Sequence, residues 1–144
     1  MIVVDATVLA HLLLGGECER RARALLVRDP DWVAPRVWRT VFRELLVVYR
    51  QRHALGVTDA VQLAADAERI LRGADYEVEL GRVLAVAERT GRCALDCEHA
   101  ALARELGVPY VTADRALAAA MGQGTVWLGE LGEAGEEKAL DVER

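Results

Sequence analysis

The sequence lacks a long hydrophobic run. No apolar stretch in its 144 residues reaches the roughly 20 residues that a membrane-spanning helix needs. The N-terminus shows neither the basic segment nor the small-residue cleavage site of a signal peptide. We therefore expect a cytoplasmic protein without a membrane partner.

Cysteine is scarce and odd in number, with three residues in the whole chain. A disulfide framework is therefore not expected. Cys93 and Cys97 lie four positions apart, a spacing that matches no common zinc pattern. We interpret these two residues and Cys18 as small apolar residues of the interior.

Positive charge is also limited, because the formal net charge is −5. Phosphate binding rests on lysine and arginine, so this balance by itself disfavours a nucleic-acid partner. Residues 130–144, however, contain six acidic and two basic residues, a balance of −4 that leaves −1 for the rest of the chain. The basic residues are 17 arginines and one lysine. Arginine binds phosphate well, but genome composition can produce the same bias, so the charge excludes neither possibility.

Strand-like and helix-like segments alternate along the chain, which indicates parallel βαβ units. The predicted strands are residues 2–5, 32–34, 108–112 and 125–128. Apolar residues at helical spacing, with glycine or proline near the ends, predict the helices; these are 6–14, 17–28, 35–52, 58–71, 77–89, 96–106 and a short one ending near 121. We expect one domain, residues 1–128, followed by an acidic and mobile tail, residues 129–144.

Three aspartates stand at predicted junctions between elements. Asp5 closes the first strand, Asp114 follows the strand 108–112, and Asp96 opens a helix. Parallel strands release their C-terminal ends at one edge of a sheet, so we expect the three carboxylates to meet there. Carboxylates in close contact repel one another unless a cation neutralises them, and Mg²⁺ or Mn²⁺ prefers such oxygens together with retained waters. The pattern predicts a metal-dependent hydrolase that acts on a phosphodiester.

Each aspartate also has a structural interpretation. An aspartate at a helix N-terminus is often a cap, which applies to Asp96 and, with Arg115 as a local ion-pair partner, to Asp114. Asp5 is harder to explain in this way, because a carboxylate directly after a buried strand costs free energy unless it is paired. The histidines show no ligand spacing, and we interpret His99 as a partly buried helix residue.

Four segments, taken in order and at their spacing, resemble the PIN-domain family and in particular the small VapC-type toxins. They are Val-Asp-Ala-Thr-Val-Leu at 4–9, Ala-Pro-Arg-Val-Trp-Arg-Thr-Val-Phe-Arg-Glu-Leu-Leu at 34–46, Leu-Asp-Cys-Glu-His-Ala-Ala-Leu-Ala at 95–103 and Leu-Gly-Val-Pro-Tyr-Val-Thr-Ala-Asp-Arg at 106–115. The resemblance covers about residues 1–128. It implies a three-layer α/β/α fold with a central parallel sheet of about four to five strands.

The same resemblance implies an activity and partners. It points to a Mg²⁺- or Mn²⁺-dependent endoribonuclease that hydrolyses RNA, forms a homodimer and is held inactive by a cognate antitoxin. Asp5, Asp96 and Asp114 fall on three acidic positions of the family, and Thr112 falls on the Thr or Ser that commonly precedes the last acid. Asp5 and Asp96 would then bind the metal, Asp114 would complete the site or hold its waters, and Thr112 would brace a carboxylate.

The chain departs from the family at the fourth acid. The family usually has Glu where Val41 stands and Asn where Glu44 stands. Positions i and i+3 share a helix face, so Glu44 is a candidate for the metal site from a shifted position. It is equally a candidate surface partner for an arginine. The departure keeps a second hypothesis open, a catalytically impaired PIN-like module that acts by binding RNA or protein.

An arginine stripe is predicted on the helix after Pro35, formed by Arg36, Arg39, Arg43 and Arg50, of which the first three are the candidate RNA contacts. This stripe is a candidate contact for an RNA backbone, a candidate surface for acids of a partner chain, or a solvated face without function. Trp38 lies on the same helix and is the residue that we expect at a dimer or partner contact.

Overall fold

A parallel sheet of five short strands forms the middle layer of the computed structural model, which describes residues 1–72 and 75–132. The strand order is β3-β2-β1-β4-β5. The strands are β1 Ile2–Val4, β2 Trp32–Pro35, β3 Asp75–Tyr76, β4 Tyr110–Thr112 and β5 Thr125–Trp127. The central strand β1 consists only of apolar, fully buried residues, as expected for a strand covered on both faces.

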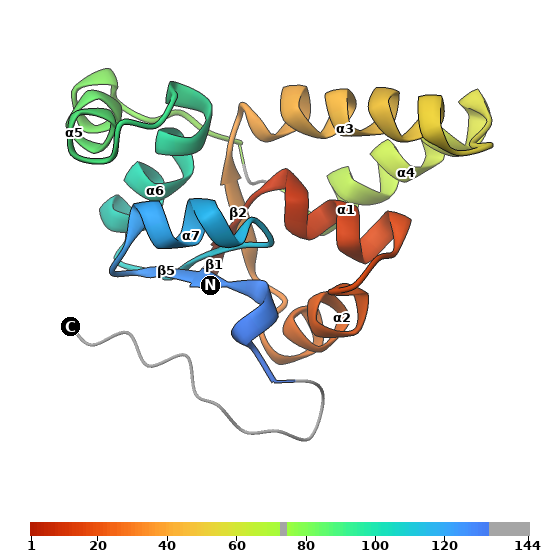
Figure 1. Ribbon diagram of the computed structural model, residues 1–144, viewed down its shortest axis with the longest axis horizontal. Helices are drawn as coiled ribbons and strands as arrows, with labels where there is room; N and C mark the ends of the chain where they lie inside the picture. The colour runs from red at the N-terminus through yellow and green to blue at the C-terminus, as the bar shows by residue number, and fades with distance from the viewer. Residues whose placement is uncertain (73–74, 133–144) are drawn as a thin grey trace.

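Seven α-helices are described, and they cover both faces of this sheet. Helices α1–α4 lie on one side of the strands and α5–α7 on the other (Figure 1). Their bounds are α1 Ala6–Leu14, α2 Glu19–Arg28, α3 Trp38–Arg52, α4 Val57–Ile70, α5 Leu80–Thr90, α6 Ala94–Leu106 and α7 Arg115–Met121, with a short 3₁₀ helix, η1, at Leu128–Glu130. The predicted three-layer α/β/α architecture with a parallel sheet is confirmed.

The inner face of α3 anchors this helix to the core. Trp38 and Phe42 are each 1% exposed and their rings pack with centroids 6.3 Å apart. Their i, i+4 spacing places both on one side of the helix. The prediction that Trp38 contacts a partner is therefore wrong, because its side chain is already buried within the chain.

Three predicted boundaries shift in the structure. Pro35 ends β2, where it pairs with Tyr76, so α3 begins at Trp38. The two-residue strand β3 was missed because it is too short to show an alternating pattern, and α5 begins only at Leu80. Asp96 does not open α6, which begins two residues earlier at Ala94.

The packed part of the chain continues past the predicted domain boundary at 128. Leu131 is 6% exposed, and Arg21 Nε donates a hydrogen bond of 2.8 Å to its carbonyl oxygen. Most of the predicted tail, residues 133–144, lies outside the described residues. No helix within residues 1–72 and 75–132 is long and apolar enough to cross a membrane.

The cysteines follow the prediction in two cases of three. Cys18 and Cys97 are buried, whereas Cys93 is exposed at the start of α6. All three are free thiols.

Candidate carboxylate site

Asp5 is held by hydrogen bonds to both of its carboxylate oxygens. Oδ1 accepts from the backbone N–H groups of Thr7 (2.9 Å) and Val8 (3.3 Å), which caps α1, and from the Thr7 hydroxyl (2.5 Å). Oδ2 accepts from the phenol of Tyr110 at 2.8 Å. The residue is only 6% exposed, and four donors compensate for this burial. Both interpretations made from the sequence are thus compatible: Asp5 is a helix cap and also a fixed carboxylate at the sheet edge.

Thr7 joins the ends of two neighbouring strands. Besides donating to Asp5, its hydroxyl oxygen accepts a hydrogen bond of 2.9 Å from the backbone N–H of Ala113 and lies 3.4 Å from the hydroxyl of Thr112. Thr112 ends β4, which pairs with β1 in parallel. One hydroxyl therefore connects the C-terminal ends of β1 and β4.

Asp114 lies at the exposed rim of this network. Its Oδ1 accepts from the backbone N–H of Leu117 at 3.0 Å and caps α7. Its own N–H donates to the Thr112 hydroxyl at 3.1 Å. Thr112 thus fixes the backbone of Asp114. The carboxylate that accepts a hydrogen bond from a threonine hydroxyl is that of Asp5, and the donor is Thr7.

Asp96 reaches the same region from the first turn of α6 and is half-buried. Its charge acts on Tyr110, as does that of Asp5. Burial, the charge and hydrogen bond of Asp5 and the charge of Asp96 together raise the pKa of Tyr110. The phenol therefore stays protonated and remains a donor to Asp5 at neutral pH.

His99 packs beneath this tyrosine as a neutral ring. Its imidazole stacks on Tyr110 with centroids 5.7 Å apart, and it is 3% exposed. Nδ1 lies 3.0 Å from the carbonyl oxygen of Leu95, so the hydrogen is on Nδ1. Burial lowers the pKa of His99, with the charge of Asp5 acting in the opposite direction. His99 was predicted as a partly buried helix residue, and the structure places it on α6 with its side chain almost fully buried.

The structure places Glu44 on the exposed side of α3. Within the described residues it makes no hydrogen bond or ion pair, whereas Val41, one turn earlier, is half-buried against the core. The contribution of Glu44 to a metal site stays a prediction.

One arginine of the stripe, Arg39, is bound within the fold itself. Arg39 donates to Glu68 with Nε at 2.5 Å and Nη2 at 2.6 Å, and also pairs with Asp75. Its guanidinium lies 5.0 Å from the ring centroid of Trp38. Of the three predicted RNA contacts, this leaves Arg36, 3.9 Å from Glu77, and the exposed Arg43 as the more accessible ones.

The fit to a divalent cation depends on these donors. Among residues 1–72 and 75–132, no three His, Cys, Asp or Glu side chains form a group that could hold a metal ion. Mg²⁺ commonly binds one or two carboxylates and keeps several waters. The negative charges of Asp5 and Asp96 both act on Tyr110. Their carboxylate oxygens are metal ligands of the kind that Mg²⁺ prefers. These carboxylate ligands therefore suit Mg²⁺ or Mn²⁺, although the described residues do not bring three such ligands together.

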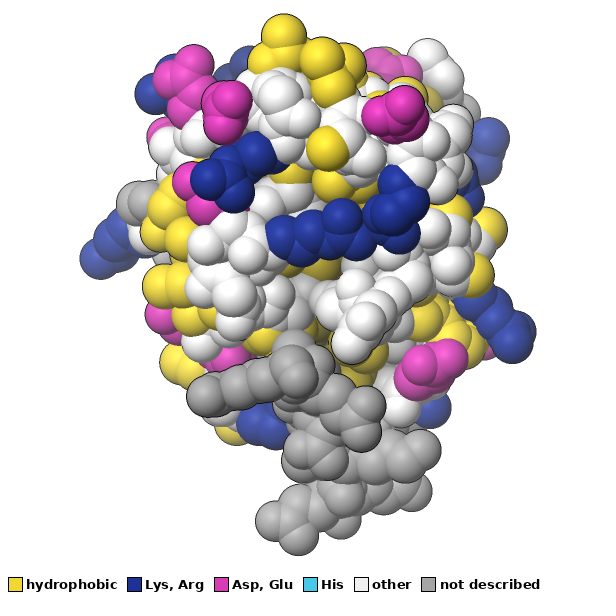
Figure 2. Space-filling model, turned by 90° about the vertical axis from the view of Figure 1, so that its left-hand side faces the viewer, with side chains coloured by type: hydrophobic (Ala, Val, Ile, Leu, Met, Phe, Trp, Pro, Cys, Tyr) yellow, Lys and Arg dark blue, Asp and Glu magenta, His cyan; other side chains and the backbone are white. Residues whose placement is uncertain are grey.

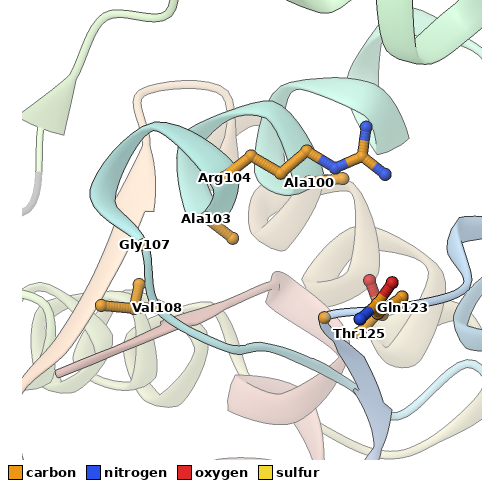
Figure 3. Close-up of a pocket in the computed structure, with 8 residues that line it drawn as sticks. Ala100, Ala103, Arg104, Gly107, Val108, Gln123 and Thr125 are labelled. Carbon is orange, nitrogen blue, oxygen red and sulfur yellow. The ribbon is translucent and has the colours of Figure 1, made fainter. Parts of the chain in front are cut away.

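A pocket of about 240 Å³ lies elsewhere, between the end of α6 and the start of β5 (Figure 3). It is lined by Ala100, Ala103, Arg104, Gly107, Val108, Gln123, Gly124 and Thr125. Val108 and Gly124 precede β4 and β5, so the pocket lies at the N-terminal ends of these strands. Asp5, in contrast, follows the C-terminal end of β1.

Basic side chains cross the middle of the face that includes α5–α7 (Figure 2). Burial and the charge of Arg89 lower the pKa of Arg104. Arg89 Nη2 donates to the carbonyl oxygen of Met121 at 3.2 Å, at the end of α7. Arg89 thereby stabilises the C-terminus of that helix.

Comparison with known proteins identifies the family. The model of the PIN domain matches residues 2–122. The chain belongs to the PIN domain family. No curated protein matches it.

Solved structures of low sequence identity share the fold of this PIN domain. PAE2754 from Pyrobaculum aerophilum is 19% identical with a TM-score of 0.70, over 89% of this chain and 90% of that one. FitAcB from Neisseria gonorrhoeae is 16% identical with a TM-score of 0.66, over 91% of this chain and 100% of that one. FitAB bound to the IR36 DNA fragment is also 16% identical, with a TM-score of 0.66 and coverage of 93% and 99%.

Thr7 and Tyr110 are the residues of this site that the sequence did not reveal. Thr7 follows Asp5 by two positions, which is the local spacing of a side-chain turn and offered a weak signal. Tyr110 is an aromatic residue in a short strand, which by itself indicates only a β structure. Its contact with Asp5 spans 105 positions of sequence and became visible only in the fold.

Proposed function

We propose that this PIN domain is a Mg²⁺- or Mn²⁺-dependent endoribonuclease of the VapC type, the toxin component of a toxin–antitoxin pair. PIN domains are generally nucleases. The observation that carries the proposal is the Asp5 carboxylate, which is buried at the sheet edge and fixed by hydrogen bonds from Thr7 and Tyr110. The charge of Asp96, in the first turn of α6, acts on the same phenol.

Each residue of the site has a role in this proposal. Asp5 and Asp96 hold the cation, and Asp114, at the exposed rim, holds its waters. When bound, the cation supplies a water of lowered pKa and neutralises charge on the phosphate. Thr7 and Tyr110 keep Asp5 in one orientation, and Glu44 contributes an acid from the next turn of α3.

The partners follow from the resemblance to VapC-type toxins. We propose that the chain forms a homodimer and is inhibited by a cognate antitoxin protein. FitAB, which is similar in fold, is bound to a DNA fragment in its solved structure, and this supports a function connected with nucleic acid.

Cleavage of RNA by matched variants tests the activity. The unmodified chain should cleave single-stranded or loop RNA when Mg²⁺ or Mn²⁺ is added. Asp5→Asn and Asp96→Asn should each lower the rate at least about 100-fold, because each removes a charged cation ligand. Glu44→Gln should lower it less, and Asp59→Asn, at an exposed position of α4, should leave it unchanged. Metal-dependent cleavage that survives both Asp5→Asn and Asp96→Asn contradicts the proposal.

A second function is favoured by one observation, the half-buried apolar Val41 at the usual position of the fourth acid. It is a PIN-like module that binds RNA or protein without turnover. Thermal unfolding in millimolar Mn²⁺ separates the two, because a ligand at 100 times its Kd stabilises a fold by about 2.7 kcal/mol. No stabilisation, together with no cleavage of a mixed RNA pool, favours the module.

A further inference from the structure

Trp127 lies at the same sheet edge as the carboxylates. It ends β5 and pairs in register with Thr112 at the end of β4. Its indole Nε1 donates a hydrogen bond of 3.3 Å to the carbonyl oxygen of Ala113, the residue directly before Asp114. The ring is therefore tied to the backbone of the site itself.

The ring is also fixed by the chain that follows it. A Cβ atom added at Gly129 would collide with three carbon atoms of the indole. The ring thus lies flush against the Gly129 backbone, where no larger residue fits without moving it. The hydrogen bond to Ala113 and the close packing against Gly129 together hold the Trp127 ring in one position.

Arg115 rests on this ring. Its guanidinium carbon is 4.9 Å from the ring centroid, within the range of a cation–π interaction. The side chain is exposed, and no carboxylate of the described residues lies within ion-pair distance of it. The local Asp114–Arg115 ion pair considered from the sequence is therefore not formed.

This arrangement places a positive charge beside the carboxylate site, which on its own would repel a phosphate. A phosphate that approaches Asp5, Asp96 and Asp114 meets negative charge, and Arg39, one of the predicted RNA contacts, is already paired with two acids. A guanidinium matches a phosphate with two parallel hydrogen bonds. An arginine that is held on an aromatic ring loses less freedom on binding than one that moves freely in solvent.

We propose that Arg115, positioned by Trp127, binds a phosphate of the RNA strand next to the carboxylate site. The inference rests on the proposed function and adds to it a direction for the substrate. The strand extends from Asp114 along the C-terminal end of β5, in preference to the arginine stripe of α3.

Binding without cleavage tests this contact. Fluorescence anisotropy of a labelled single-stranded RNA of mixed sequence is measured in EDTA at several salt concentrations, so that turnover plays no part. Arg115→Gln should weaken binding about 5- to 10-fold and reduce the slope of log K against log salt by about 0.7, the contribution of one phosphate contact in single strands. Trp127→Leu keeps the charge and frees the guanidinium, so it should weaken binding less and leave the slope nearly unchanged.

Arg52→Gln is the matched control, because Arg52 is an exposed arginine at the far end of α3. It should bind RNA like the unmodified chain, and thermal unfolding should show all variants folded. Equal affinity and equal slope for Arg115→Gln and Arg52→Gln overturn the proposal, as does a lack of RNA binding by the unmodified chain at low salt. Weakened binding in Arg115→Gln together with metal-dependent cleavage that survives both Asp5→Asn and Asp96→Asn supports the phosphate contact and rejects the proposed function alone.

Discussion

Single hydroxyl groups decide how the central carboxylate of this protein is oriented. Thr7 supplies two of the donors to Asp5 Oδ1, and Tyr110 supplies the donor to Oδ2. A buried carboxylate with an unpaired oxygen carries a desolvation cost. Thr7 and Tyr110 therefore contribute to stability as well as to the geometry of the site.

Removal of the phenol oxygen tests this contribution. Tyr110→Phe keeps the ring stacked on His99 but leaves Asp5 Oδ2 without its donor. We expect the free energy of unfolding, measured by urea denaturation, to fall by about 1–3 kcal/mol. Tyr76→Phe, at a half-buried tyrosine with no described hydroxyl hydrogen bond, is the control. Equal losses in the two variants would show that the Tyr110 phenol does not stabilise Asp5.

At the scale of elements, one arginine connects three pieces of secondary structure. Arg39 on α3 binds Glu68 of α4 with a forked pair of hydrogen bonds and also pairs with Asp75 of β3. The hydrogen bonds from Arg39 lower the pKa of Asp75. The two-residue edge strand β3 therefore depends on a side-chain clamp in addition to its short ladder with β2.

Arg39→Lys tests the clamp, because lysine keeps the charge and loses the fork. We expect a loss of about 1–2 kcal/mol in the free energy of unfolding and faster hydrogen exchange in β3. Arg36→Lys, whose partner Glu77 is 3.9 Å away and exposed, should change neither quantity. Unchanged exchange in β3 for Arg39→Lys would mean that the backbone ladder alone holds this strand.

The free energy of unfolding of the whole molecule depends on pH through one buried histidine. His99 is buried and neutral, and its pKa is lowered in the fold. The unfolded chain takes up a proton on this residue below about pH 6.5, whereas the folded chain does not. The unfolded state then binds more protons, so the free energy of unfolding decreases as the pH falls through this value.

His99→Phe should flatten this dependence. Between pH 7 and 5, the unmodified chain should lose up to about 1.4 kcal/mol per pH unit from His99, and the variant should lose less. Urea denaturation at three pH values measures the slope. His53→Phe, at an exposed histidine, should retain the slope of the unmodified chain. A slope that persists in His99→Phe assigns the acid sensitivity to other groups.

Local patterns were enough to predict most of the fold. The strands β1, β2, β4 and β5 and the order of the helices follow from apolar runs and from glycine at helix ends, as at Gly107, whose φ of 66° ends α6. The edge strand β3 was not predictable, because a strand of two residues is too short to show an alternation of apolar and polar residues. Trp38 was misjudged because helical spacing does not say which aromatic residue faces the core.

The candidate site was predictable only in its acids. Asp5 directly follows β1 and Asp114 lies two residues after the end of β4, so parallel topology brings them to one edge. The partners that fix them are tertiary contacts, such as Tyr110 with Asp5, which no local pattern contains. The pairing of Arg39 with acids 29 and 36 positions away was hidden for the same reason. The RNA contact of Arg39 stays a prediction.

The hydrogen bonds of Asp5 also have a consequence for biosynthesis. Tyr110 and Thr112 are made about 105 residues after Asp5 and Thr7, and β1 gains its neighbour β4 only when that late segment has emerged from the ribosome. Contacts of such long separation close slowly, after local helices have formed. A nascent or truncated chain that ends before residue 110 holds Asp5 without its phenol donor and lacks β4 on one side of β1. Whatever chemistry this site performs is therefore withheld until nearly the whole domain has been synthesised.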